Sequence, residues 1–517
     1  MTLSQDVSLV RTRAGELIGL REGKVVTFRA VPYAAPPVGQ LRLAPPQPVQ
    51  PWNGVRAATE RGVASLQPPS YADAFMGPLL VPGYDEDCLT LSVWTPAPNS
   101  AEKLPVLVWF HGGGFMFGAG SAAYYDGRVM AERGRMVVVS VNYRLGALGY
   151  LYLAPGMLGP QPVANLGLQD QCQALEWVRD NIASFGGDPG NVTVAGQSAG
   201  ALSIIGLAAM PRAAGLFRRA IMHSGARTLQ AHSVEAAQKV TDRFLRAAGV
   251  APGDVASLRS LSPTRILEAQ QKTIMEMAAG LGYDPRLRPA AMAPFQLVVD
   301  GEVLPIEPAK AALQGSFDNI DVLLLNTAEE MRFVFSFDDA FWKRDRGSIL
   351  ADVERTWGEE GVTTFAKYER RRPTKSAPEV LSDMLGEEGA VPSIQLAERL
   401  AAIGRPAYYA WFTWRSPAIN GRLGAAHVVE LPFVFNNAED WAQAPMVTAG
   451  DASEIRRLSQ QMQDAWVSFA ATGVPRADWP PYVPPQRTAM EFGPRIRVML
   501  DPAPDRTATG LTFRAAS

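Results

Sequence analysis

Continuous apolar runs, rich in β-branched residues, recur along the chain from residue 105 onward. The first two cover residues 105–110 and 136–141. Runs in which apolar residues do not alternate with polar ones are typical of central strands that are buried on both faces of a sheet. We expect further strands of this kind at residues 192–195, 220–222, 321–325 and 407–413.

Helical patterns separate several of these strands. The clearest covers residues 168–178, where apolar side chains recur three and four positions apart. Strands that alternate with helices predict an α/β fold, in which helices cover both faces of a mostly parallel sheet.

Two segments depart from this alternation. Proline-rich turns at residues 31–37 and 44–46 lie between short apolar stretches, which predicts a small N-terminal β region with irregular connections. Residues 341–400 are charged, contain aromatic side chains and lack strand patterns, which predicts a helical insertion above the sheet. Because no repeat or flexible linker divides the chain, we expect one domain over residues 1–517.

Composition and charge narrow the range of partners. The chain has 517 residues, of which 47% are hydrophobic and 19% are charged, and this balance is typical of a globular protein. A formal net charge of −2 provides no field that would attract nucleic acid or an anionic membrane surface. Residues 1–7 lack the features of a secretory signal, and no apolar stretch is long enough to span a bilayer. We therefore expect a cytoplasmic protein that binds neither nucleic acid nor membrane.

The cysteine content excludes a disulfide framework and a multi-cysteine zinc site, because Cys88 and Cys172 are the only two cysteines. Neither lies in a motif that would lower the pKa of a thiol, so a catalytic cysteine is disfavoured. We expect both to be reduced and buried.

The strongest chemical motif is Gly-Gln-Ser-Ala-Gly at residues 196–200, centred on Ser198. It follows the strand expected at 192–195 and precedes the helix-prone residues 201–207. This is the context of a nucleophile elbow, a sharp turn that needs glycines on both sides and holds the serine exposed. The simpler interpretation is a glycine-tolerant turn at the end of a strand.

A second glycine motif, His-Gly-Gly-Gly-Phe at residues 111–115, follows the strand expected at 105–110. Glycines allow the N–H groups of Gly113 and Gly114 to point toward one place, where, with the N–H of Ala199, they would stabilise an oxyanion. Residues 118–123 loosely fit a dinucleotide-binding motif instead. That alternative is disfavoured because the motif does not open at the end of a strand and no acidic residue follows at 137–142.

A serine nucleophile needs a histidine to accept its proton and a carboxylate to orient that histidine. The chain has four histidines, and elimination by position selects one of them. His111 precedes Ser198, and His223 and His232 follow it too closely for an acid to intervene, so His427 is left. For the acid, spacing cannot choose between Glu329 and Glu330, which follow the strand expected at 321–325; Asp338 and Asp339 are nearby alternatives.

Several stretches together resemble the type-B carboxylesterase family, which has the α/β-hydrolase fold. Residues 185–200 (FGGDPGNVTVAGQSAG) resemble its active-site signature, and residues 85–96 (DEDCLTLSVWTP) resemble its second signature. Further resemblance runs from residues 31–34 (VPYA) to residues 466–473 (WVSFAATG). It therefore spans nearly the whole chain.

The resemblance implies specific roles. It implies Ser198, Glu330 and His427 as a catalytic triad, because residues 328–332 (AEEMR) look like the family's acid loop, although Leu325 stands where a glycine is usual before that loop. It likewise implies an oxyanion hole from Gly113, Gly114 and Ala199. Pocket walls are expected to include Phe115, aromatic residues after Glu330 such as Phe335, and residues of the 341–400 insertion.

The departures from the family bear on the substrate. Gln197 stands where cholinesterases have glutamate, and no tryptophan lies between Ser65 and Asp87 to contact a choline group. Cys88 should be free, because Ser65 stands near the place of its disulfide partner in relatives that have one.

We therefore expect a serine carboxylesterase that hydrolyses small, neutral carboxylic esters through an acyl-enzyme, without a cofactor or metal. The alternatives are an amidase or carbamate hydrolase with the same triad, and a non-catalytic binding relative. Nothing in the sequence indicates an oligomeric state.

Overall fold

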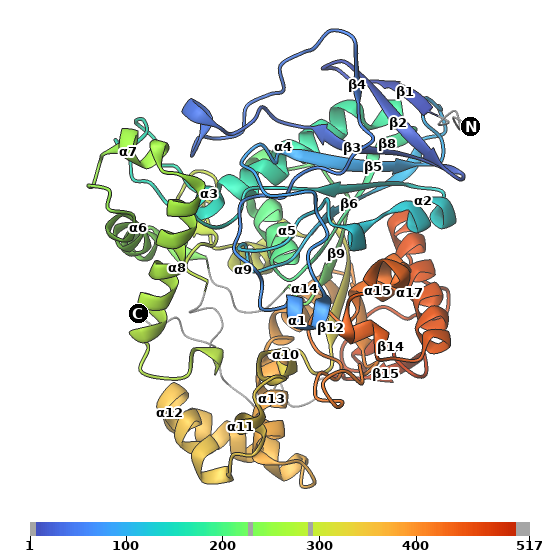
Figure 1. The fold of residues 1–517 in the computed structure, drawn as a ribbon. Helices are drawn as coiled ribbons and strands as arrows, with labels where there is room; N and C mark the ends of the chain where they lie inside the picture. The colour runs from blue at the N-terminus through green and yellow to red at the C-terminus, as the bar shows by residue number, and fades with distance from the viewer. Residues whose placement is uncertain (1–6, 226–230, 288–292, 503–517) are drawn as a thin grey trace.

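The computed structural model describes residues 7–225, 231–287 and 293–502. Within these residues, thirteen strands form one large sheet in the order β1-β2-β3-β5-β7-β6-β8-β9-β12-β13-β14-β15, and β4 pairs with β2 (Figure 1). The strands are β1 (Val7–Arg11), β2 (Glu16–Glu22), β3 (Val25–Pro32), β4 (Val55–Ala57), β5 (Thr90–Thr95), β6 (Leu104–Phe110), β7 (Val137–Val141), β8 (Gly187–Gln197), β9 (Arg219–His223), β12 (Asp321–Thr327), β13 (Tyr408–Phe412), β14 (Thr488–Phe492) and β15 (Arg497–Leu500). A second sheet joins β10 (His232–Ser233) to β11 (Val298–Val299).

The middle of the large sheet is parallel. Strands β7, β6, β8, β9, β12, β13 and β14 all run in one direction, and Val108 of β6 pairs with Val139 on one side and Val194 on the other. Strands β1, β2, β3 and β5 pair antiparallel at one edge and form the expected N-terminal β region. The predicted α/β-hydrolase architecture is thus confirmed, and all six predicted strands are present.

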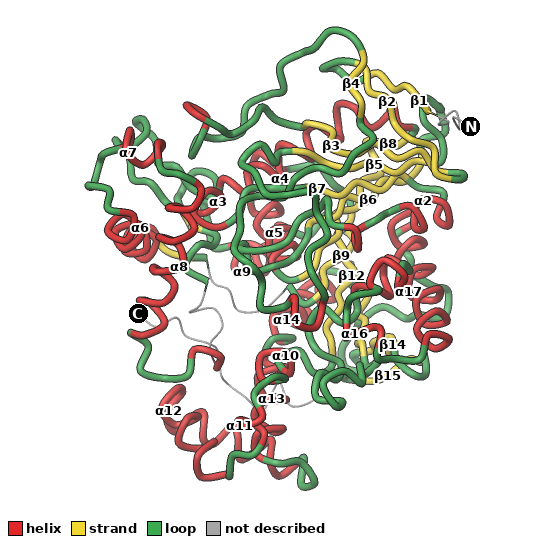
Figure 2. The backbone as a smooth tube through the Cα atoms, viewed as in Figure 1, coloured by secondary structure: helices red, strands yellow, loops and turns green. Residues whose placement is uncertain are grey.

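Alternate residues of the central strands enter two separate cores. In β6, Val106, Val108 and Phe110 pack on one face, and Leu107 and Trp109 pack on the other. Figure 2 shows helices on both sides of the strands. The first core includes residues of α3 (Gly146–Tyr150), α4 (Leu166–Asn181) and α5 (Ala199–Ala209); the second includes residues of α2 (Arg128–Gly134), α15 (Leu431–Phe435) and α17 (Ala452–Thr472).

The segment after β12 is helical, as expected. It contains α10 (Arg332–Phe335), α11 (Asp339–Trp342), α12 (Arg346–Arg371), α13 (Ala377–Glu388) and α14 (Val391–Ala402), and no strand lies among its described residues 341–400. Helix α13 packs closely on the acid loop that follows β12, since a Cβ added at Gly386 would lie 3.4 Å from the backbone nitrogen of Glu330.

The remaining described helices of the first two thirds of the chain are peripheral or short. They are α1 (Asp73–Met76), α6 (Val234–Ala248), α7 (Val255–Ser260), α8 (Pro263–Ala279) and α9 (Pro308–Ala311); α16 (Pro445–Thr448) follows later. None of the helices in the described part of the chain is long and apolar enough to cross a membrane. Residues 1–6, on which the expectation of no secretory signal largely depends, lie outside the described residues, and the cytoplasmic location stays a prediction.

Candidate active site

The predicted site residues follow four strands of the parallel sheet. Ser198 follows β8, residues 111–115 follow β6, Glu330 follows β12 and His427 lies in the loop after β13. The carboxyl ends of parallel strands meet at one edge of a sheet, which is where open α/β sheets bind ligands. The strand order β6-β8-β9-β12-β13 therefore brings loops that are far apart in sequence to the same edge.

Ser198 occupies a sharp turn between β8 and α5. Its backbone has φ 55° and ψ −122°, a conformation that costs a non-glycine residue about 1–3 kcal/mol. The flanking glycines make the turn possible: a Cβ added at Gly196 would lie 2.6 Å from the carbonyl carbon of Gly200, and one added at Gly200 would lie 2.0 Å from the carbonyl oxygen of Phe110. Ser198 is partly exposed, whereas Gln197 and Ala199 are buried.

The glycine loop after β6 lies against this turn. Gly113 has φ 117°, and a Cβ at this position would lie 2.1 Å from the carbonyl oxygen of Phe117, so only glycine fits. The N–H groups of Gly113, Gly114 and Ala199 donate no hydrogen bond to any acceptor among the described residues. Ala199 is the first residue of α5, where a backbone N–H has no partner within the helix.

Glu330 and His427 form a buried pair. The Nδ1 atom of His427 lies 2.7 Å from Oε2 of Glu330, and their side chains are 8% and 1% exposed. The other oxygen of Glu330 accepts hydrogen bonds from the hydroxyl of Ser224 and from the backbone N–H of Thr327 at 2.9 Å. Burial alone would raise the pKa of Glu330, but the charge and hydrogen bond of His427 and the bonds from Ser224 and Thr327 outweigh it and lower the pKa to about 2. Glu330 is therefore ionised at neutral pH.

This pairing determines which nitrogen of His427 can act as a base. Because the carboxylate of Glu330 accepts a hydrogen bond from Nδ1, the proton of the neutral ring is on Nδ1 and the lone pair is on Nε2. The side-chain amide of Gln197 donates to Nε2 at 3.1 Å, which places the basic nitrogen beside the residue that precedes Ser198.

The other histidines are engaged elsewhere. His111 is buried, its Nδ1 donates to the carbonyl oxygen of Gly112 at 2.8 Å, and burial lowers its pKa to about 4. His223 is fully buried, and its Nε2 accepts a hydrogen bond from Trp466 Nε1 at 2.7 Å. His232 lies in β10, where its ring contacts the side chain of Gln296. Among the described residues, none of the three is hydrogen-bonded to any of the acidic candidates Glu329, Glu330, Asp338 and Asp339.

The cysteines are likewise unsuited to nucleophilic chemistry. Cys88 and Cys172 are both free and buried, and burial raises the pKa of each thiol to about 12. A thiol of this kind stays protonated at neutral pH and is not a nucleophile.

Glu329, the neighbour that spacing could not separate from Glu330, has different partners. Its Oε1 pairs with Arg332 at 2.9 Å and with Arg415, and its Oε2 accepts the N–H of Ala425 at 2.9 Å. Asp338 caps α11, and Asp339 pairs with Arg422. Of the four acidic candidates, only Glu330 is bonded to His427.

Aromatic side chains line up from the surface to His427. Phe333 stacks on the His427 ring with centroids 5.4 Å apart, and Tyr71 stacks on Phe333 at 6.2 Å. Tyr71 also meets the edge of Phe117 at 6.3 Å. Tyr71 is 66% exposed and Phe333 is 9% exposed, so the stack leads from solvent to the base.

The two aromatic residues expected in the pocket wall are both buried. Phe115 packs against Tyr150 with centroids 4.6 Å apart, and Phe335 stacks on Phe341 at 3.9 Å beneath Arg286. Their place in a pocket wall stays a prediction.

Sequence reasoning missed two contributors to this site, Ser224 and Tyr71, and included Phe333 only among the aromatic residues expected after Glu330. Ser224 directly follows β9, so its position at the carboxyl edge was a usable signal. Phe333 lies three residues after Glu330 in the short helix α10, so it belongs to the aromatic residues expected there, although it was not named. Tyr71 lies in a loop far from the other residues in sequence and carried no signal.

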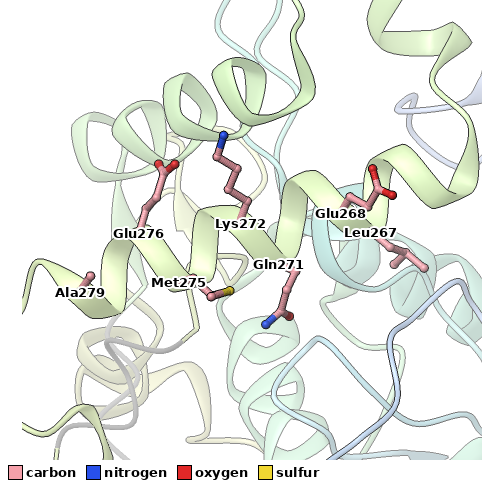
Figure 3. Close-up of a pocket in the computed structure, with 7 residues that line it drawn as sticks. All are labelled: Leu267, Glu268, Gln271, Lys272, Met275, Glu276 and Ala279. Atoms are coloured by element: carbon pink, nitrogen blue, oxygen red, sulfur yellow. The ribbon is translucent and has the colours of Figure 1, made fainter.

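One groove in the structure shares no residue with this site. An open groove of about 670 Å³ runs along α8 and is lined by one face of that helix (Figure 3). Its lining residues are Leu267, Glu268, Gln271, Lys272, Met275, Glu276 and Ala279. None of them is a predicted site residue. Among the described residues, no group of three or more histidine, cysteine, aspartate or glutamate side chains could hold a metal ion.

Comparison with known proteins identifies the family of this chain. A sequence model of the carboxylesterase family matches residues 6–507. The chain is 35% identical over 504 residues to the para-nitrobenzyl esterase of Bacillus subtilis (strain 168), covering 96% of this chain and 97% of the relative. It is 34% identical over 480 residues to the phenmedipham hydrolase of Pseudarthrobacter oxydans, covering 92% of each. The crystal structure of the Geobacillus stearothermophilus carboxylesterase Est55 at pH 6.2 superposes with a TM-score of 0.82 at 34% identity, over 97% of this chain and 99% of that one.

Proposed function

The chain belongs to the carboxylesterase family and is a carboxylic ester hydrolase, and we propose that it works with Ser198 as nucleophile, His427 as base and Glu330 as the acid of the triad. The observation that carries this proposal is the buried bond of 2.7 Å between His427 Nδ1 and Glu330 Oε2. That bond orients Nε2 as the proton acceptor at the same sheet edge as Ser198.

Each step follows from these positions. Ser198 Oγ attacks the ester carbonyl carbon, and its proton passes to His427 Nε2. When the tetrahedral intermediate collapses, the carbon–oxygen bond to the alcohol breaks, His427 returns the proton to the leaving oxygen, and the acyl group remains on Ser198. Water then attacks the acyl-enzyme, His427 takes a proton from it, and the carboxylic acid leaves. Glu330, ionised because its pKa is about 2, stabilises the imidazolium in both halves of the reaction.

The oxyanion of the tetrahedral intermediate is assigned to the N–H groups of Gly113, Gly114 and Ala199. Support comes from the positive φ of both glycines, the partial exposure of the loop, and N–H groups that no described acceptor occupies. Loss of one such donor typically costs about 3 kcal/mol of transition-state stabilisation.

The proposed substrates are uncharged esters, with an aromatic group favoured on one side of the ester bond. The neutral amide of Gln197 lies beside Ser198, and the stack of Tyr71, Phe333 and Phe117 offers ring faces and edges that attract an aromatic group. A relative named for a para-nitrobenzyl substrate supports this class.

Carbamate hydrolysis is the second candidate. The similarity to a phenmedipham hydrolase favours it, and the same triad can attack a carbamate carbonyl. A non-catalytic binding role is disfavoured because Ser198, Glu330 and His427 are all present and the last two are bonded.

The test is turnover of p-nitrophenyl acetate and p-nitrobenzyl acetate by the wild type and by Ser198→Ala. We expect the variant to retain less than about 10⁻³ of the wild-type kcat/KM, since the proton acceptor has no nucleophile to activate. Undiminished turnover by the variant would refute the assignment. Parallel assays with an aryl carbamate separate the two candidates, and a higher kcat/KM for the carbamate would favour the second.

A further inference from the structure

The acid and the base of the proposed triad lie on two different loops, and their bond requires those loops to stay in register. Glu330 follows β12 and His427 follows β13, with a turn at residues 416–424 between β13 and the histidine. Besides the His427–Glu330 bond itself, three hydrogen bonds join residues 329 and 330 to residues 425 and 427. Glu329 N donates to Ala425 O at 2.9 Å, Ala425 N donates to Glu329 Oε2 at 2.9 Å, and His427 N donates to Glu330 O at 3.2 Å.

Glu329 takes part in two of these three bonds and supplies the only side chain among them. Its backbone N–H donates to the carbonyl oxygen of Ala425, and its carboxylate accepts a hydrogen bond from the N–H of Ala425. Ala425 lies two residues before His427. The contact is also tight, because a Cβ added at Gly424 would lie 2.3 Å from Glu329 Oε2.

The other oxygen of Glu329 is held in place by two arginines. It bonds to Arg332 Nη1 at 2.9 Å and to Arg415, and Arg332 Nε in turn donates to the carbonyl oxygen of Arg422 at 2.8 Å. The side chains of Glu329 and Arg332 are only 7% and 8% exposed. Arg415 and Arg422 both belong to the segment that leads to His427, so both oxygens of Glu329 act on the loop that carries the base.

We propose that Glu329 is a positioning residue, a clamp that holds the histidine loop on the acid loop so that His427 Nδ1 meets Glu330. This proposal rests on the proposed function of His427 and Glu330. Without the carboxylate, Ala425 N–H loses its acceptor and Arg332 is left buried without its partner. Residues 425–427 would then be held on residues 329 and 330 only by two main-chain bonds and by the His427–Glu330 bond itself, and His427 would lose its fixed distance from Glu330.

A displaced base slows proton transfer but does not change how the substrate is held. Displacing a catalytic group by about 1 Å can cost about 10²-fold in rate. The clamp therefore predicts a loss in kcat with little change in KM. A residue that only stabilised the fold would lower the amount of folded enzyme and leave the turnover of each folded site unchanged.

The experiment compares Glu329→Ala, Glu329→Gln and Glu86→Ala with the wild type. Glu86 is the matched control: it is a buried carboxylate, 9% exposed, whose side-chain hydrogen bonds among the described residues go to Arg42. Each protein is reacted to completion with an organophosphate to count competent sites, and kcat per labelled site, KM and the initial rate of labelling are measured on a p-nitrophenyl ester.

We expect kcat per labelled site to fall about 10²-fold in Glu329→Ala and about tenfold in Glu329→Gln, which keeps one acceptor oxygen, with KM within about threefold in both. The labelling rate should fall with kcat, because the same base activates Ser198 for both reactions. Glu86→Ala should label fewer sites but turn over normally at each one. The Gln variant decides the matter if the Ala variant does not fold.

Wild-type kcat per labelled site in both Glu329 variants would overturn the clamp. The result is separable from failure of the triad itself, because in that case Ser198→Ala or Glu330→Gln would keep its activity. If both of those variants are inactive while the Glu329 variants turn over normally, only the clamp is refuted.

Discussion

Replacing Glu330 by Gln removes one negative charge from a buried cluster and changes its shape very little. The surroundings lower the pKa of Glu330 from 4.5 to about 2 against the opposing effect of burial, which corresponds to about 3 kcal/mol in favour of the carboxylate. Loss of about 3 kcal/mol of charge stabilisation would slow the reaction roughly 10²-fold.

The side-chain amide of the Glu330→Gln variant has a second effect, on the tautomer of His427. Its NH₂ group would face Nδ1, which is already a donor, and would favour the tautomer with the proton on Nε2, where the ring cannot accept the proton of Ser198. In the serine protease template, the corresponding amide substitution lowers kcat about 10⁴-fold. We therefore expect Glu330→Gln to lose between about 10² and 10⁴ in kcat, with the larger value if the tautomer changes fully.

The assay is steady-state hydrolysis of a p-nitrophenyl ester at pH 8, with the thermal unfolding midpoint measured on the same samples. Glu329→Gln is the matched control, because it makes the same chemical change at the adjacent residue, and it should lose only about tenfold. A loss of less than tenfold in Glu330→Gln, or equal losses in the two variants, would refute the assignment of Glu330.

Three further outcomes follow from the geometry. Gly113→Ala should lower kcat at least about 10²-fold, because its Cβ would lie 2.1 Å from Phe117 O and must displace the oxyanion loop; unchanged kcat would contradict that role. Phe333→Ala should raise KM more for p-nitrobenzyl acetate than for ethyl acetate, and equal changes would remove the aromatic stack from the substrate site. The ionised Glu330 should stabilise the fold by about 3 kcal/mol above pH 4.5, and this stabilisation is lost as pH falls toward 2. In urea unfolding, the difference in unfolding free energy between wild type and Glu330→Gln should therefore shrink across that range. A difference that stays constant with pH would contradict the lowered pKa.

The sheet was predictable because burial on both faces leaves a direct mark on the sequence. Strands β6, β7 and β8 carry continuous apolar runs, and their alternate residues enter the two cores. The glycine motifs were predictable for a similar reason, since close backbone approach at Gly196 and Gly200 admits no side chain. Both kinds of signal are local.

The local sequence does not contain the information that distinguishes Glu329 from Glu330. Both carboxylates are buried, and they differ only in what they meet: Glu330 faces His427, and Glu329 faces Ala425 and two arginines. Except for Arg332, those partners are 86 to 97 residues away along the chain and reach the site through the pairing of β12 with β13. Spacing along one strand end carries no information about them, and family resemblance supplied the choice.

The aromatic stack was hidden for the same reason. Tyr71 comes from an N-terminal loop and Phe333 from the helix after the acid loop, and their contact depends on how distant loops fold over the sheet edge. Phe335, two residues further on, is buried and stacks on Phe341, and its place in the pocket wall stays a prediction. Which side of a one-turn helix faces the site is decided by packing against α11 and α13.

The most direct test of Ser198 as the nucleophile is to locate the covalent adduct of an organophosphate by mass spectrometry. Trypsin would release residues 180–212, a peptide that contains Ser184, Ser198 and Ser203, and fragmentation distinguishes them. We expect one adduct per chain, on Ser198, formed in step with the loss of esterase activity. An adduct on any other residue, or full activity with Ser198 modified, would contradict it.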